Sequence, residues 1–188
     1  MMMTLIAFSD PSLVIFPLHR LVRGIASSAL ARLEGQLDKF FTLKPVPLTE
    51  NLVSNLKHKM IGGAFLGILG LVPQSLVLLR QRHDVYFEDM MPKNHSQAYK
   101  NFNISLLNHL ILGGILGVAQ DSEDIAYTVD VDEACQQIKE GKYQLAFLLS
   151  PPQLEIIKAI ADAKDRMPRK STYFYPKLPT GLIINPLD

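Results

Sequence analysis

Apolar residues recur at helical spacing in the first half of the chain. A helix is predicted to start after Ser27 or Ser28, because either hydroxyl can cap its first turn. Its apolar face consists of Leu30, Leu33, Leu37, Phe40 and Phe41. The following "TLKPVPL" is expected to be extended, since each proline disfavours the helical region for the residue before it. Thr49 can cap a second helix, whose inner stripe is Leu52, Val53 and Leu56.

Short apolar runs bounded by turn residues predict strands. "MMMTLIAFSDPSLVIFPLHR" is interpreted as two strands joined by a Ser-Asp-Pro turn, with Val14 to Phe16 in the second. Residues 63–70 and 75–82 flank "VPQS" and are predicted to form a hairpin.

From Ile125 onward the pattern alternates between strand and helix. "IAYTVDV" predicts a strand, followed by a short helix from Asp132 to Gly141 and a buried strand, "YQLAFLLS". The arrangement from Ser150 to Gln153 is typical of a capping box, and the helix it starts is expected to end at Pro168. That helix presents Leu154, Ile157, Ile160 and Ala161. The closing segment is predicted to be a hairpin that turns at residues 177–181, which gives a β-α-β-α-hairpin order.

Two apolar windows are candidates for transmembrane helices. Residues 60–79 and 101–120 carry no Asp, Glu, Lys or Arg, and each contains a Gly-x-x-x-Gly. The first is interrupted by "VPQS", and the second contains asparagine, serine and histidine, so its apolar core is too short to span ~30 Å. The second is instead predicted to be a helix packed on a sheet, with the face Ile104, Leu107, Ile111, Ile115 and Val118. We therefore expect no membrane association.

Composition and charge narrow the class of protein. With 188 residues, 48% of them hydrophobic and 20% charged, the chain is expected to form one α+β domain over residues 1–188, a mixed sheet with packed helices. The net charge of +1 argues against nucleic acid as a partner, so any anion site must be local. The single Cys135 is interpreted as a small buried apolar residue. The scarcity of cysteine and the lack of a signal peptide pattern at the N-terminus favour the cytoplasm.

The sequence offers no recognised catalytic or metal motif. The five histidines are scattered without a His-x-x-x-His, and Glu88, Asp89 and His95 in a polar stretch are interpreted as solvated surface, so no metal site is predicted. Neither a Gly-x-Ser-x-Gly, a Walker motif nor a Gly-x-Gly-x-x-Gly after a strand is present. Catalytic residues and cofactors are therefore left open.

Two basic clusters are candidates for binding. The first, "PLHRLVRG", contains His19, Arg20 and Arg23 near the end of a strand. On a strand, His19 and Arg23 share one face and Arg20 takes the other. Arginine offers planar, bidentate donors to phosphate or carboxylate, which suggests an anion clamp. The alternative is two surface arginines beside a half-buried histidine.

The second cluster lies in "RMPRKSTYFYPKLPTGLIINPLD". Lys170, Ser171, Tyr173 and Lys177 could together hold a phosphate or a polar substrate. Strand alternation places Ser171, Tyr173 and Tyr175 on one face and Lys170 on the other. The alternative is a terminal hairpin, in which aromatic residues favour the strand and basic residues discourage edge pairing.

These stretches, with "LAFLLSPP" between them, resemble the prokaryotic family called domain of unknown function 1015, in the family's order and over essentially the whole chain. The resemblance implies the C-terminal part of a protein about twice this length, either shortened by a late start or encoded separately. The family's N-terminal half carries an Asp-Gly-His-His-Arg-Tyr-like motif similar to ParB-type domains, some of which bind nucleotides or phosphorylate serine. No His-His-Arg occurs here, so an activity in that motif is not expected of this chain. The family usually has Pro-Thr-His-Arg where this chain has "PLHR", a departure that removes one hydroxyl.

The leading hypothesis is a binding or accessory module for a phosphate-bearing small molecule. In it, His19 supplies a titratable donor, Arg20 and Lys170 supply charge, and Ser171 with Tyr173 orients the ligand. One alternative is a fragment of a small-molecule kinase or other phosphoryl-transfer enzyme. Another is a structural interaction domain, with a homo-oligomer covering the N-terminal strand.

Overall fold

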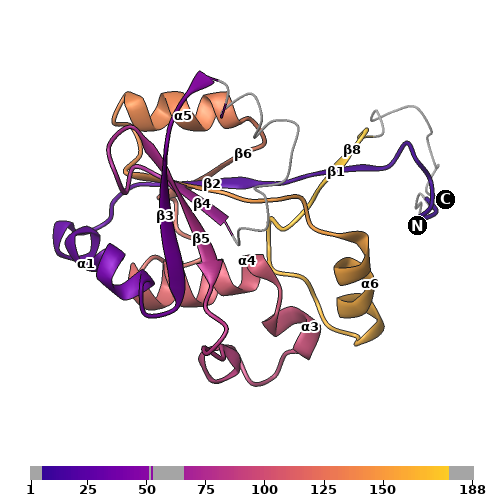
Figure 1. The fold of residues 1–188 in the computed structure, drawn as a ribbon. Helices are drawn as coiled ribbons and strands as arrows, with labels where there is room; N and C mark the ends of the chain where they lie inside the picture. Colours follow the sequence, from indigo (N-terminus) through magenta and orange to yellow (C-terminus); the bar gives the residue numbers. More distant parts are fainter. Residues whose placement is uncertain (1–5, 51, 53–65, 178–188) are drawn as a thin grey trace.

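The computed structural model describes residues 6–50, 52 and 66–177. Figure 1 shows the arrangement of its elements. The strands are β1 (Val14–Phe16), β2 (His19–Val22), β3 (Phe41–Pro47), β4 (Leu66–Leu69), β5 (Ser75–Gln81), β6 (Ile125–Thr128), β7 (Leu145–Leu148) and β8 (Tyr173–Tyr175). The helices are α1 (Ser27–Leu37), the short η1 (Glu88–Met90), α3 (Gln97–Lys100), α4 (Asn103–Leu106), the π-helix η2 (Leu107–Ile115), α5 (Val131–Lys139) and α6 (Leu154–Asp162).

The chain has the predicted α+β fold, built around a six-stranded sheet with packed helices. The strand order is β3-β5-β4-β7-β2-β6. Every pairing in the sheet that the structure describes is antiparallel, a simpler arrangement than the mixed sheet we predicted. The predicted extended stretch is β3 at the sheet edge, where Pro45 and Pro47 are tolerated because an edge strand leaves half its amides unpaired.

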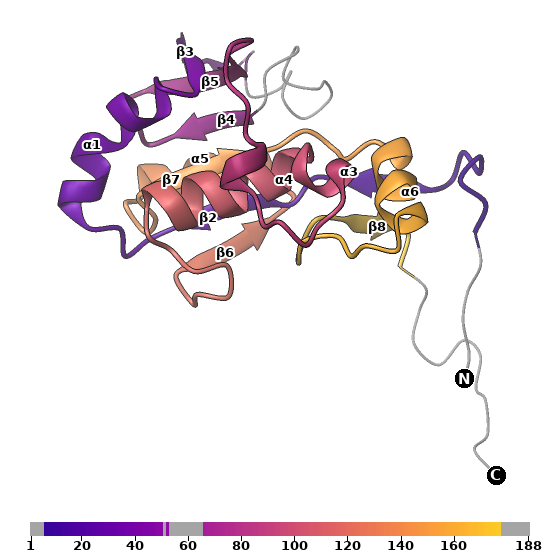
Figure 2. The same cartoon turned by 90° about the horizontal axis from the view of Figure 1, so that it is seen from below.

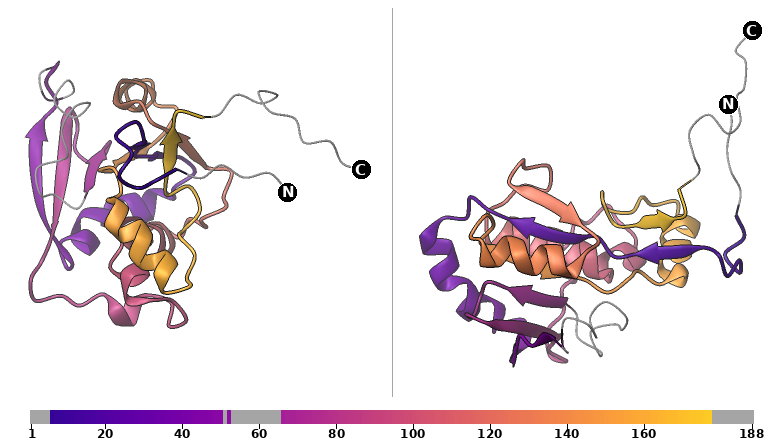
Figure 3. Two further views of the ribbon diagram at one scale, coloured as in Figure 1. Left: turned by 90° about the vertical axis from the view of Figure 1, so that its right-hand side faces the viewer. Right: turned by 90° about the horizontal axis from the view of Figure 1, so that it is seen from above.

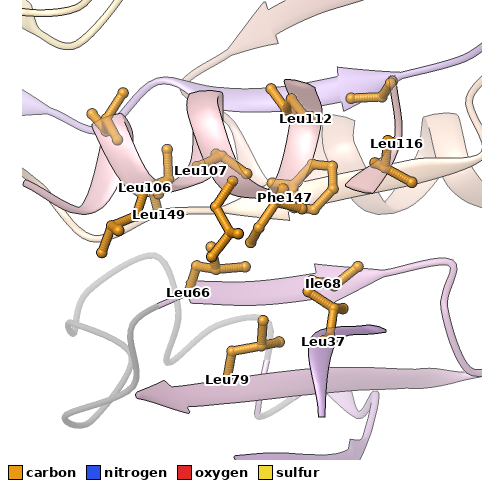
Figure 4. Close-up of a cluster of buried hydrophobic side chains, with 14 of the residues drawn as sticks. Leu37, Leu66, Ile68, Leu79, Leu106, Leu107, Leu112, Leu116, Phe147 and Leu149 are labelled. Carbon is orange, nitrogen blue, oxygen red and sulfur yellow. The ribbon is translucent and has the colours of Figure 1, made fainter. Parts of the chain in front are cut away.

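Helices cover both faces of the sheet. One face of the strands packs with α1, α4 and η2 in the larger apolar cluster, and the other packs with α5 in a smaller one. Figure 2 shows α4 and its continuation running across the sheet. In Figure 4, Leu107 and Leu112 of η2 lie above Phe147, with Ile68 and Leu79 from neighbouring strands below. These side chains are almost completely buried, so this cluster is the main core.

Strands β1 and β8 form a separate two-stranded ribbon, in which Phe16 lies opposite Tyr173. The ribbon extends past the end of the main sheet, and α6 lies beside it (Figures 1 and 2). The left panel of Figure 3 looks onto this end of the molecule. We predicted that the closing segment would be a hairpin with its own turn, but the described partner of β8 is β1, from the other end of the chain. The predicted turn beyond Lys177 lies outside the described residues.

Several predicted boundaries are wrong at helix ends. Helix α1 starts after Ala26, without a side-chain cap from either serine, and it ends before Phe41, which opens β3. The predicted capping box before α6 is also absent: Gln153 occupies the N-cap position and its side chain does not bond the helix. Helix α6 ends at Asp162 rather than Pro168, because Lys164 turns into the left-handed region with φ +55°.

Other local predictions are confirmed. The 75–82 half of the hairpin is β5, and its partner β4 contains the described part of the other half. The predicted short helix is α5, which begins at Val131, one residue before the predicted Asp132. The Asp130 carboxylate caps it by accepting a hydrogen bond from the Asp132 amide, and Gly141 follows the helix with φ +69°. The Thr49 hydroxyl accepts the amide of Leu52 as a cap would, although the rest of that helix lies outside the described residues.

The apolar window of residues 101–120 forms α4 and η2, whose residues Ile104, Leu107 and Ile111 are buried as predicted. Within the part of the chain that the structure describes, none of the helices has the length and apolar character needed to cross a bilayer. Cys135, predicted to be buried, is half-buried on α5 beside the smaller apolar cluster.

Candidate functional site

Arg20 is the most deeply buried charged residue among those described, with only 1% of its surface exposed. Its neighbours across the sheet are Tyr127 on β6 and Phe147 on β7. Nη1 donates to the carbonyl oxygen of Leu18 at 2.8 Å, and Nη2 donates to that of Lys170 at 3.2 Å. Two of the five N–H donors therefore have protein acceptors in the described residues.

A turn in the segment before β8 brings Lys170 to the same place. Lys170 has φ +56°, and the Ser171 hydroxyl donates to the carbonyl of Pro168 at 2.6 Å, which closes the turn. The Lys170 Nζ lies 5.8 Å from the centroid of the Tyr127 ring, and the Arg20 Cζ lies 5.6 Å from the same centroid. Two cations 150 positions apart in sequence thus share one aromatic ring.

The electrostatics of Arg20 are unusual for a buried charge. Within the described residues, no carboxylate lies within ion-pair distance of its guanidinium. Burial lowers the pKa of Arg20 to about 10, and the nearby Tyr127 hydroxyl opposes this only in part. A buried cation without a counter-charge is unfavourable, so an anion that reached this guanidinium would be bound more strongly than one at the surface.

His19 lies on the opposite face of β2 from Arg20, as strand alternation predicted. Its Nδ1 accepts the amide of Leu149 at 3.1 Å, so in the neutral ring the proton sits on Nε2. Burial and the charge of Arg20 lower the pKa of His19 to about 4, against a smaller opposing effect of Asp130. The imidazole is therefore neutral at pH 7, and the structure does not bring it together with Lys170.

Arg23, Tyr173 and Lys177 lie away from Arg20. Arg23 is exposed beyond β2, where its Nε lies 3.4 Å from the Asp124 carboxylate. Tyr173 is on the ribbon, and the Lys177 Nζ lies 4.9 Å from its ring centroid. The Ser171 proton is used within its own turn, which leaves this hydroxyl none to donate to an anion. Of the predicted set, the structure brings together Arg20, Lys170 and Ser171.

Sequence reasoning missed a polar cluster between the helices. The Asp165 carboxylate accepts a hydrogen bond from the His95 Nδ1 at 2.9 Å, and the His95 ring stacks on Tyr99 with 3.8 Å between centroids. The Tyr99 hydroxyl in turn lies 2.9 Å from the His109 Nε2. We had interpreted His95 as solvated surface, since nothing in the local pattern indicates a partner 70 positions away.

A groove of about 940 Å³ lies between α5 and the β4–β5 turn, lined by residues such as Leu69, Pro73 and Ile138. None of the predicted site residues lines it. Among the described residues, no group of three or more His, Cys, Asp or Glu side chains has a geometry that could hold a metal ion.

No protein-family model matches the chain, and no curated protein sequence matches it. Solved structures with a similar arrangement include a free serine kinase in complex with AMP, at 13% identity and a TM-score of 0.45 over 89% of this chain and 55% of that one. A variant of that kinase in complex with ADP is 12% identical, with a TM-score of 0.45 over the same shares. A conserved hypothetical protein from Pyrococcus furiosus is 11% identical, with a TM-score of 0.45 over 90% of this chain and 59% of that one. The chain thus spans a little over half the length of these structures, and a likeness of this degree carries no functional argument.

Proposed function

We propose that the chain is a binding module for a phosphate-bearing small molecule, with Arg20 and Lys170 providing the positive charge. The observation that carries the proposal is the burial of the Arg20 guanidinium without a carboxylate partner among the described residues. A buried arginine that stabilises a fold usually has an acidic partner. Here the second charge next to it, Lys170, is also positive.

Phosphate is an anion that these donors can bind well. A guanidinium presents parallel N–H groups that match two phosphate oxygens, and an ammonium adds a mobile point charge. Because both cations lie within 6 Å of the Tyr127 centroid, an anion between them would relieve their mutual repulsion. Tyr173 and Lys177 are close in sequence to Lys170, and their part in binding stays a prediction.

The proposal is tested by thermal unfolding with inorganic phosphate, AMP, ADP, ATP and CTP. A ligand at 100 times its dissociation constant stabilises the folded state by about 2.7 kcal/mol. For a chain of this size, that corresponds to a rise in melting temperature of about 5–10 °C.

Lys170→Asn and Lys164→Asn form a matched pair of variants. The two lysines have φ +56° and +55°, and asparagine tolerates this region, so the substitutions differ in position rather than in backbone strain. We expect Lys170→Asn to lose most of the phosphate-dependent stabilisation and Lys164→Asn to keep it. The proposal fails if none of the five probes stabilises the wild-type protein, or if the two variants respond alike.

Phosphoryl transfer remains the enzymatic alternative. It predicts that the protein converts ATP to ADP in the presence of Mg²⁺ and a hydroxyl acceptor, whereas a binding module leaves ATP intact. Chromatography of the nucleotide after incubation distinguishes the two.

An interaction domain is favoured by one specific observation. The β1–β8 ribbon exposes Val14, Phe16 and Tyr175, which are 41%, 38% and 52% accessible. Such neighbouring apolar side chains are typical of surfaces that a partner covers. If a second copy covers them, sedimentation will show a dimer that Phe16→Asp dissociates; a monomer at all concentrations would remove this alternative.

Membership of the domain of unknown function 1015 family is likewise a proposal, supported by the order and content of the three stretches quoted above. Sequencing upstream of the first codon tests it. An open frame that encodes a His-His-Arg-bearing half would support it, and a stop codon with a ribosome-binding site before Met1 would make the short form a protein in its own right.

A further inference from the structure

The carboxylate of Asp165 joins two separate parts of the fold. One oxygen accepts hydrogen bonds from the His95 Nδ1 at 2.9 Å and from the backbone amide of Arg166 at 2.7 Å. The other accepts the amide of Ser96 at 2.7 Å. The Asp165 side chain is only 11% exposed, so water competes weakly for these bonds. Asp165 therefore ties the end of α6 to the start of α3.

The other end of the same segment is tied to the sheet. The Lys170 carbonyl oxygen accepts a hydrogen bond from the Arg20 guanidinium. The Ser171 hydroxyl donates a hydrogen bond to the carbonyl of Pro168, which closes the turn. Between these two attachments the chain has no regular secondary structure. Its basic side chains Arg166 and Arg169 are exposed to solvent. Met167 packs against the main core and Pro168 is buried, so the position of Lys170 depends on these contacts together with the attachments at both ends.

The partner of Asp165 is itself held rigidly. The His95 ring stacks on the buried Tyr99, whose hydroxyl contacts His109 on the π-helix. The His109 Nδ1 then lies 3.4 Å from the side-chain Nε2 of Gln120. The anchor of Asp165 is therefore connected to the main core and not to a surface loop.

We propose that Asp165 is a positioning residue for the anion site, which fixes the segment ending in Lys170 so that its ammonium stays beside Arg20. The inference rests on the proposed function and assigns a determinant of affinity outside the ligand-contacting residues. The carboxylate does not touch the ligand. It acts by lowering the population of states in which the segment has left the sheet.

The test compares Asp165→Asn with Asp162→Asn in the full chain. Asparagine at 165 presents an N–H donor toward the amide of Ser96 or toward His95, so at least one of the three bonds is lost. Asp162 is an exposed residue one helical turn after its ion-pair partner Lys158, and it controls for the loss of an acidic side chain nearby.

The first readout needs no ligand. Limited trypsin digestion followed by mass spectrometry gives the rate of cleavage after Arg166 and Arg169. We expect Asp165→Asn to raise this rate about tenfold and Asp162→Asn to leave it unchanged, because cleavage follows the population of the open segment. Urea unfolding of both variants shows whether the fold as a whole is intact.

The second readout is affinity for inorganic phosphate by calorimetry. Because only the closed segment presents Lys170, we expect the dissociation constant of Asp165→Asn to rise by the factor by which the closed fraction falls; a tenfold rise corresponds to a segment that is open about 90% of the time. If Asp165→Asn does not fold, His95→Gln, which removes one bond and leaves the Ser96 contact, should give a smaller change in both readouts. Unchanged cleavage, or unchanged affinity in a variant whose cleavage rate approaches that of the urea-unfolded chain, would overturn the inference while the proposed function stands. A wild-type protein that binds none of the phosphate probes would overturn the proposed function, and the role of Asp165 with it.

Discussion

The substitution Arg20→Met tests whether the buried arginine serves anion binding or the stability of the fold. Methionine fills much of the same volume without a charge. Burial lowers the pKa of Arg20 to about 10, against about 12.5 for a free guanidinium. Since a pKa change of one corresponds to 1.36 kcal/mol, the buried charge costs about 3 kcal/mol. Below pH 10 the group is charged in both the folded and unfolded states, so this cost is fully present at pH 7.

Two hydrogen bonds oppose this cost. The guanidinium donates to the carbonyls of Leu18 and Lys170, and each bond from a charged donor contributes about 1.5–3 kcal/mol. Together the two hydrogen bonds contribute about 3–6 kcal/mol, which equals or exceeds the cost of about 3 kcal/mol for burying the charge. We therefore expect Arg20→Met to lower the free energy of unfolding by about 0–3 kcal/mol, a small loss for the replacement of a fully buried side chain.

The assay is urea unfolding at pH 7, with and without saturating phosphate. We expect the Arg20→Met variant to unfold cooperatively near the wild-type midpoint, with the same dependence on urea, and to lose the phosphate-dependent increase. A loss above about 5 kcal/mol would show that Arg20 is a structural residue. Retention of the phosphate effect would place the anion site elsewhere.

Three further predictions concern the fold. Gly70→Ala should destabilise the protein by more than about 2 kcal/mol in urea unfolding, because its Cβ would lie 2.2 Å from a backbone carbonyl oxygen at φ +88°. Gly117→Ala, with φ +69° and open space around it, should cost only about 1 kcal/mol, and equal losses would contradict this reasoning. Phe147→Ala, in the middle of the main core, should cost about 3–5 kcal/mol by the same assay, and a loss below about 1 kcal/mol would contradict the packing described. Because the folded pKa of His19 is about 4 and the unfolded value about 6.5, stability should fall by about 3 kcal/mol as the pH drops from 6.5 to 4; His19→Asn should remove this dependence, and an unchanged pH profile in that variant would assign it to other groups.

Local sequence patterns determined much of the secondary structure. The apolar stripe of residues 101–120 predicted a buried helix, and the prolines of "TLKPVPL" predicted an extended segment, which the structure shows as β3. These predictions hold because side-chain periodicity and proline geometry act over a few residues. Helix ends were less predictable. Ser27, for example, could cap a helix, but the chain instead begins α1 directly after Ala26.

The candidate site was only partly accessible to sequence reasoning. Both basic clusters were identified, and strand alternation separated His19 from Arg20 correctly. That Arg20 contacts the carbonyl of Lys170, and that Asp165 holds His95, could not be predicted. Neither residue carries a local sign of its partner.

Local patterns were thus sufficient to predict the α+β class, many of the strands and helices, and the residue types available for anion binding. Three features depend on long-range packing: β8 pairs with β1, Arg20 is buried without a carboxylate among the described residues, and Lys170 shares the Tyr127 ring with it. The physical reason is the separation along the sequence over which each kind of interaction acts. Periodicity and capping act between residues a few positions apart, whereas these contacts join segments between 43 and 161 positions apart, which only the packing of the whole core brings together.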